Sequence, residues 1–180
     1  MSNSNIVPLK LRPHLVSFLM TEMQGESKSF AGYRCKILNI PGHSFVGSFL
    51  LEHLEKIDYP VKNIQTFNMF LDVKATSRKR FVSKGSFYKI ESLGRSYVYL
   101  PQEFAETVNN IFEQHFRNSF FHYVDARVDN GNCITRSILA FIDKYDLFEV
   151  NFTQAQLRQL YYKLKKEGLC FSLNNNLRRK

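Results

Sequence analysis

Basic residues are concentrated in two segments of this chain. Residues 74–95 carry seven cations against one anion, and residues 156–180 carry the same numbers. The two segments hold 14 of the 25 cations and 2 of the 16 anions, so the rest of a chain with a net charge of +9 is mildly acidic. Clustering of this kind is the electrostatic footprint expected of a nucleic-acid-binding protein. An acidic membrane surface or an acidic protein partner would attract the same charges.

The first basic segment contains cations interleaved with aromatic residues. Its core is the stretch ATSRKRFVSKGSFYKI, residues 75–90, which has no acidic residue. On a β-hairpin these cations can contact a phosphate backbone while the rings pack beneath them. Basic residues also keep strand edges from pairing with other chains, so a solvated hairpin explains the same pattern. The phosphate-binding hypothesis assigns four residues to DNA: Arg78, Lys79, Arg80 and Lys84.

The second basic segment contains a predicted amphipathic helix from Gln154 to Glu167, capped by Thr153 and followed by Gly168. Its apolar stripe is centred between Leu157 and Leu164, and polar residues follow one flank. Gln and Arg can read base edges, and Lys can hold phosphate. A packing helix with a solvated cationic face is the alternative. The candidate groove-facing residues are Gln154, Arg158, Tyr162, Lys165 and Lys166.

Two consecutive helices with a basic second helix are similar to a helix-turn-helix, and a basic hairpin beside them would form a wing. The stripe of Ile134, Ile138 and Ile142 predicts the helix that precedes the basic one. The connector 146–152 departs from that motif, because a helix-turn-helix joins its helices by a turn of about 3–4 residues.

Signals for an enzyme are thin. No pair of histidines has H-x-H or H-E-x-x-H spacing, and no glycine-rich phosphate loop occurs. We therefore expect no catalytic residue, no metal site and no cofactor. One alternative is a metal-dependent nuclease, in which Asp58 and Asp72 would hold Mg²⁺ and Lys74 would steady the attacking water. The Asp-x-Lys triplet that suggests it arises by chance in many proteins.

The cysteines and the apolar runs indicate a cytoplasmic protein. Three widely spaced cysteines, Cys35, Cys133 and Cys170, favour reduced thiols. The N-terminus has no apolar signal core, and no apolar run approaches about 20 residues. We expect no membrane partner.

Three stretches follow one pattern, in which an extended apolar segment leads through a proline into an amphipathic helix. The prolines are Pro13, Pro41 and Pro101. Proline suits the first turn of a helix, and the residue before it prefers extended geometry. Each stretch therefore predicts a strand that ends where a helix begins. Further strands are predicted at residues 64–73, 80–90, 95–100 and 120–128.

These elements predict an α+β fold with a mixed, mostly antiparallel sheet, packed helices and a C-terminal helical pair, of which a winged helix is one form. The break at 129–132, Asp-Asn-Gly-Asn, marks the predicted boundary. We expect an α/β domain at 1–130, a helical pair at 131–170 and a flexible basic tail at 171–180.

The end of the chain carries one resemblance. The sequence ILAFIDKYDLFEVNFTQAQLRQLYYKLKKE resembles the ending of small proteins from gut Bacteroidetes and their mobile elements. Those proteins close with a helix, a short acidic and apolar connector, and a helix rich in Leu, Tyr, Arg and Lys. They have no established activity, so no functional residue is carried over. The resemblance implies a bacterial cytoplasmic protein with a DNA-linked role.

The leading hypothesis is a non-enzymatic DNA-binding protein, such as an accessory or regulatory factor of a mobile element. The main alternative is a protein-interaction or assembly module, in which the Phe-rich sheet forms a homo-oligomer or docks a partner. That alternative predicts an exposed apolar patch.

Overall fold

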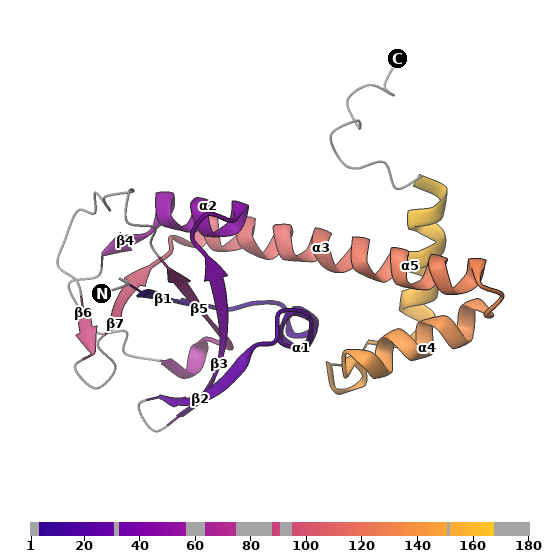
Figure 1. Cartoon of the computed structure of the whole chain (residues 1–180), viewed down its shortest axis with the longest axis horizontal. Helices are drawn as coiled ribbons and strands as arrows, with labels where there is room; N and C mark the ends of the chain where they lie inside the picture. The colour runs from indigo at the N-terminus through magenta and orange to yellow at the C-terminus, as the bar shows by residue number, and fades with distance from the viewer. Residues whose placement is uncertain are drawn as a thin grey trace, which may run out of the picture. The chain divides into compact units, whose positions relative to one another are not determined.

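The computed structural model describes residues 4–30, 33–56, 64–74, 88–90, 95–150 and 152–167 (Figure 1). The chain divides into two compact units, residues 1–111 and 112–180. Helix α3 (Gln102–Asp129) begins in the first unit and ends in the second. The predicted break at residues 129–132 forms a turn after α3, inside the second unit. The predicted tail at 171–180 lies outside the described residues.

The described residues of the first unit form a seven-stranded mixed sheet in the order β2-β3-β5-β1-β7-β4, with β6 paired to β7. Two neighbouring pairs, β1 with β7 and β3 with β5, are parallel, and the other four are antiparallel. The predicted α+β class with a mixed, mostly antiparallel sheet is therefore confirmed. The strands are β1 Ser4–Leu9, β2 Glu26–Phe30, β3 Tyr33–Pro41, β4 Glu55–Lys56, β5 Met69–Lys74, β6 Tyr88–Ile90 and β7 Arg95–Tyr99.

Strands β1 and β5 form the middle of the sheet. Each pairs with a neighbour on both sides, and residues 6–9 and 69–73 are buried throughout. A strand covered on both faces has a continuous apolar sequence rather than an alternating one. Asp72 is the exception to the apolar sequence of β5, a charged residue that is only 2% exposed.

The three strand–proline–helix units are present, with one difference. Pro13 is the first residue of α1 (Pro13–Glu22), and α3 begins directly after Pro101. Pro41, by contrast, is the last residue of β3, and α2 (Phe45–His53) begins four residues later. Ser44 caps α2 instead, because its hydroxyl accepts a hydrogen bond from the Gly47 N–H at 3.0 Å.

The strand predicted at residues 120–128 is wrong, because these residues continue α3. Aromatic and β-branched residues favoured a strand by intrinsic preference. The buried residues recur at every fourth position, which is the spacing of a helix stripe that faces a core. This tertiary packing decides the conformation. The stripe consists of Val108, Phe112, Phe116, Phe120 and Val124.

The predicted strand at 64–73 is in part a helical turn. Residues Ile64–Thr66 form the 3-10 helix η1, and β5 follows at Met69. Of the strands predicted at 80–90 and 95–100, the described parts form the antiparallel pair β6 and β7, with Tyr88 opposite Tyr97, and residues 80–87 lie outside the described residues. Residues 91–94 between these strands lie outside the described residues.

The second unit is helical. It contains the last part of α3, helix α4 (Ile134–Lys144), the 3-10 helix η2 (Leu147–Val150) and α5 (Gln154–Glu167). The predicted C-terminal helical pair is thus confirmed, with the bounds of α5 as expected. Its core is aromatic: the Phe141 ring lies 5.1 Å from Phe120 and 5.8 Å from Phe116 between centroids, in edge-to-face geometry.

Candidate nucleic-acid interface

The start of α5 is fixed by a reciprocal cap. The Thr153 N–H donates to Oε1 of Gln156 at 2.9 Å, and the Gln156 N–H donates to the Thr153 hydroxyl at 3.3 Å. This arrangement satisfies two backbone donors that a helix start otherwise leaves unpaired. The predicted Thr153 cap is confirmed, and it fixes where the first turn of α5 begins.

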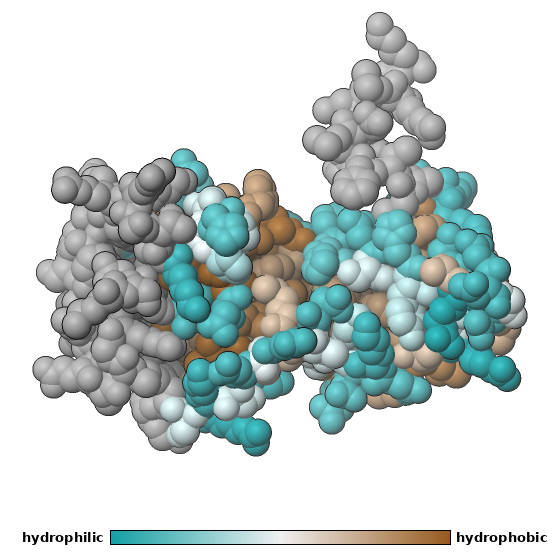
Figure 2. Space-filling view, viewed as in Figure 1, coloured by the Kyte–Doolittle hydropathy of each residue, from teal (hydrophilic) through white to brown (hydrophobic). Residues whose placement is uncertain are grey.

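One side of α5 is buried and the other is exposed. Leu157, Tyr161 and Leu164 are buried, as the predicted stripe requires, and Leu160 is half-buried. At about 100° per residue, Arg158, Tyr162 and Lys166 run from one flank of this stripe to the side opposite it. All three are exposed. In the view of Figure 2, the surface of the second unit is largely hydrophilic.

Arg158, Tyr162 and Lys166 form a row at i, i+4 and i+8, which we call the exposed row. The guanidinium carbon of Arg158 lies 5.9 Å from the centroid of the Tyr162 ring, within the range of a cation–π contact. Tyr162 is 47% exposed. The contact orders the arginine side chain on the surface while its charged group stays accessible to a ligand.

Lys165 is directed differently from its neighbour Lys166. Its ammonium lies 3.4 Å from Oδ1 of Asp125 and 3.2 Å from the Tyr161 hydroxyl. The same hydroxyl donates to Oδ1 of Asp125 at 2.8 Å, so three side chains link α5 to α3 within the second unit. Lys165 therefore serves packing first, and a phosphate would compete with this link.

The link shifts the acidity of two of its members. Burial raises the pKa of Tyr161, and the hydrogen bond to Asp125 raises it further. The hydrogen bond with Tyr161 is the main cause that raises the pKa of Lys165. Both pKa shifts are upward from values already above neutral pH, so the phenol is neutral and the ammonium is charged there, which is the pairing that the geometry requires.

The structure brings the five α5 candidates onto one helix but gives them unequal exposure. Gln154 is half-buried at the first position, and the other four are exposed. Arg78, Lys79, Arg80 and Lys84 lie outside the described residues, so their assignment to phosphate stays a prediction.

The connector between α4 and α5 is longer than a helix-turn-helix turn, as the sequence predicted. Asp146 follows α4 with a φ of 51°, a left-handed conformation that Asp tolerates better than most residues. Leu147 is buried, whereas Phe148 is 57% exposed. The connector thus has a 3-10 turn of its own, η2, in which Leu147 is packed.

The nuclease alternative gains no metal site from the described part of the chain. There, no group of three or more His, Cys, Asp or Glu side chains is placed to hold a metal ion. Asp72 is buried, Lys74 is exposed two residues later on β5, and Asp58 lies outside the described residues. Cys35 is also buried, which raises the pKa of its thiol and disfavours the reactive thiolate.

Asp125 could not be identified from the sequence, because its partner Tyr161 is 36 residues away and no local spacing connects the two. Lys165 was identifiable as a neighbour of Tyr161, since residues at i and i+4 meet on a helix. Only the folded helices show that Asp125 completes the set.

No family model, curated protein or solved structure matches this chain. Among the described helices, none is both long and apolar enough to cross a membrane. The resemblance to proteins of Bacteroidetes mobile elements stays a prediction.

Proposed function

We propose that this chain is a non-enzymatic DNA-binding protein that contacts DNA through the exposed row of α5. The observation that carries the proposal is the exposed Arg158–Tyr162–Lys166 row, on a helix with a buried opposite side and a fixed start. A helix of 14 residues is about 21 Å long. The major groove of DNA, about 12 Å wide, admits a helix of ordinary diameter.

Each member of the row has a role that suits its chemistry. Arg158 can donate two parallel hydrogen bonds to guanine or to phosphate, and its contact with Tyr162 orders it beforehand. Lys166 provides a point charge for phosphate. Gln154, at the helix start, has a side-chain amide that suits adenine. Lys165 contributes charge while it holds α5 against α3.

The proposal includes the first basic segment as a second contact. Arg78, Lys79, Arg80 and Lys84 would bind the phosphate backbone beside the groove, as a wing does in winged-helix proteins. An accessory or regulatory role for a bacterial mobile element, in the cytoplasm, agrees with the resemblance at the end of the chain and completes this proposal.

The test is binding to a generic DNA duplex at low and at moderate salt. We expect affinity that falls steeply with salt, because cations that neutralise phosphates release counterions. Binding of equal strength at both salt concentrations, or no binding at low salt, would remove the proposal. A single strand of the same length is the control, because it has no major groove for α5 to enter.

A protein-interaction module is the second candidate, and two exposed aromatic residues favour it. Phe45, at the start of α2, is 74% exposed, and Phe148 in η2 is 57% exposed. Single exposed apolar residues are common on monomers, so the case is weaker than that of the exposed row. Sedimentation without nucleic acid tests it: a homo-oligomer that Phe45→Ser or Phe148→Ser dissociates would favour this candidate.

A further inference from the structure

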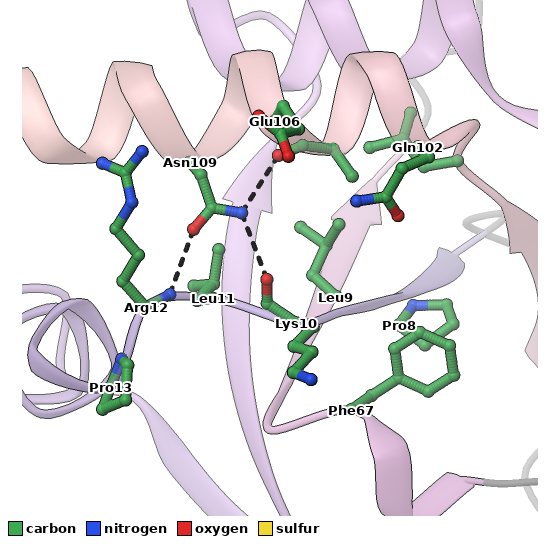
Figure 3. A pocket seen from close by; sticks show the side chains of 12 residues that line it. Pro8, Leu9, Lys10, Leu11, Arg12, Pro13, Phe67, Gln102, Glu106 and Asn109 are labelled. Atoms are coloured by element: carbon green, nitrogen blue, oxygen red, sulfur yellow. Dashed lines mark hydrogen bonds between the residues drawn. The ribbon is translucent and has the colours of Figure 1, made fainter.

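The first unit contains a pocket of about 370 Å³ between the end of β1 and the first turns of α3 (Figure 3). Its size falls within the range of about 300–1,000 Å³ that is typical of small-molecule sites. The parallel neighbours β1 and β7 both end here, and each leads into a helix. All the residues that line the pocket belong to the first unit, so it is distinct from the exposed row of α5.

Two asparagines hold the strand side of the pocket in place. Asn68 exchanges two hydrogen bonds of 2.8 Å with the backbone of Leu11. On the α3 side, Asn109 donates to the Lys10 carbonyl at 3.1 Å and accepts from the Arg12 N–H at 3.1 Å (Figure 3). The segment 10–12 is therefore fixed along both edges without being part of a strand. The pocket is preformed, which lowers the entropy cost of binding.

The pocket has an apolar floor between two polar walls. Leu9, Leu11 and Leu100 are buried beneath it, and the half-buried Phe67 forms part of the strand side. Figure 3 shows Gln102 and Glu106 on α3, across the pocket from Lys10 and Phe67. The cation and the carboxylate thus lie on opposite walls. An elongated ligand with an apolar middle and unlike polar ends would match this layout.

The polar groups are available for a ligand. Within the part of the chain that the structure describes, the side chains of Lys10, Gln102 and Glu106 make no hydrogen bond or ion pair. Arg12 also lines the pocket, but its guanidinium donates to Oδ1 of Asn110 at 2.8 Å and is therefore held against α3. The ammonium of Lys10 on the strand side, and the carboxylate of Glu106 with the amide of Gln102 on α3, distinguish the two ends of the ligand.

We propose that this pocket binds a nucleotide unit whose base carries an exocyclic amino group. The base lies over Phe67, because aromatic rings stack on bases irrespective of sequence. The carboxylate of Glu106 accepts from the amino group and Gln102 completes the contact with the base edge, as carboxylates do with cytosine. The phosphate lies against Lys10. The unit comes either from a free mononucleotide or from a single strand.

The experiment uses the full chain with the background substitutions Arg158→Ala and Lys166→Ala, so that the exposed row of α5 does not contribute. CMP, UMP and ribose 5-phosphate are titrated, and the side-chain amide signals of Gln102 and Asn109 are followed by NMR. We expect saturable shifts with CMP, binding about ten-fold weaker for UMP, and none for ribose 5-phosphate at matching concentrations. Because α5 is disabled, failure here leaves the proposed DNA contact of α5 untouched.

Matched variants test each wall. Glu106→Gln should reduce the preference for CMP over UMP about five-fold, because a hydrogen bond to a charged group is the stronger kind. Glu103→Gln, on the same helix but outside the pocket, should leave the preference unchanged. Lys10→Gln should weaken both nucleotides, whereas Lys36→Gln, an exposed cation on β3, should weaken neither. Phe67→Leu should weaken CMP at least about five-fold.

A short single-stranded DNA identifies the source of the nucleotide. Binding more than about ten-fold tighter than that of CMP, lost in Glu106→Gln, indicates a strand, and equal affinities indicate a free nucleotide. Three results would overturn the proposal: no saturable shift at millimolar CMP, ribose 5-phosphate binding as tightly as CMP, or the same preference in Glu106→Gln as in Glu103→Gln.

Discussion

Removing Arg158 and Lys166 together should change the salt dependence of DNA binding by an amount that can be calculated. Both side chains are exposed, so changing them to Ala should alter the free energy of unfolding by no more than about 0.5 kcal/mol each. Each phosphate contact on duplex DNA contributes about 0.9 to the slope of log affinity against log salt. Loss of two contacts should lower the slope by about 1.8.

This slope difference sets the expected size of the effect. A rise from about 50 to about 200 mM salt should weaken the wild type about 12-fold more than the double variant. The factor corresponds to about 1.5 kcal/mol at 25 °C. The measurement is fluorescence anisotropy with a labelled duplex at four or more salt concentrations, and thermal unfolding monitors the fold of each variant.

The matched control removes the same charge elsewhere. Arg34 and Lys36 are exposed on β3, in the first unit, so the double change Arg34→Ala and Lys36→Ala also deletes one arginine and one lysine. If binding depends on the exposed row of α5, this control should keep the wild-type slope. An equal loss of slope in both variants would mean that net charge alone drives binding. An unchanged slope in the α5 variant would refute the assignment of Arg158 and Lys166 to phosphate.

Three further predictions concern the other basic segment and the packing of α5. Alanine at Arg78, Lys79, Arg80 and Lys84 together should lower the salt slope by about 3.6 if all four contact phosphate. Tyr161→Phe should lower the free energy of unfolding by about 1–2 kcal/mol, because it removes a hydroxyl between a carboxylate and an ammonium. Thr153→Ala should cost about 1 kcal/mol through loss of the helix cap, measured by urea unfolding.

Controls and pH sharpen these predictions. Tyr162→Phe changes an exposed phenol and should be neutral to about 0.5 kcal/mol, so an equal loss in both tyrosine variants would contradict the role of the Tyr161 hydroxyl. Burial raises the Tyr161 pKa above its ordinary value of 10.0. The neutral hydroxyl therefore makes its full contribution to the free energy of unfolding below that pH. The contribution is lost as pH rises through the folded value, and Tyr161→Phe should reduce this alkaline loss of stability. Thr153→Ser should retain most of the stability that the cap of α5 contributes.

For the first basic segment, DNA binding that the four-alanine variant leaves unaltered would contradict the phosphate contacts and favour a solvated hairpin at residues 75–90.

Local signals predicted most of the elements but not their partners. The strand–proline–helix stretches and the bounds of α5 followed from turn chemistry and apolar spacing, which act over a few residues. Sheet order depends on contacts between distant residues, and nothing in the sequence indicated that β1 lies between β5 and β7. The pocket went unpredicted for the same reason, since Lys10 and Glu106 are brought together by that order.

The misassigned strand at 120–128 shows how two periodicities compete within one segment. Phe120 and Phe121 are adjacent and both buried, which either structure allows, and their intrinsic preference is for a strand. The spacing from Val108 through Phe116 to Val124 continues one helical stripe across the whole segment, so a window longer than nine residues favours the helix. Packing against the core stabilises the helix here, because most residues of 120–128, apart from Ala126 and Arg127, have only a weak helix preference.

Lys165 and Lys166 show why a count of charges overstates a binding surface. Both are exposed by area and adjacent in sequence, yet they point about 100° apart around the helix. Lys165 lies four residues after the buried Tyr161 and reaches Asp125, so its charge is already partly neutralised within the second unit. Lys166 lies four residues after the exposed Tyr162, and no such acid faces it among the described residues. A phosphate is therefore attracted by the full charge of Lys166 but not by that of Lys165. For this reason the exposed row includes Lys166 and leaves out Lys165, whose ammonium is paired with Asp125.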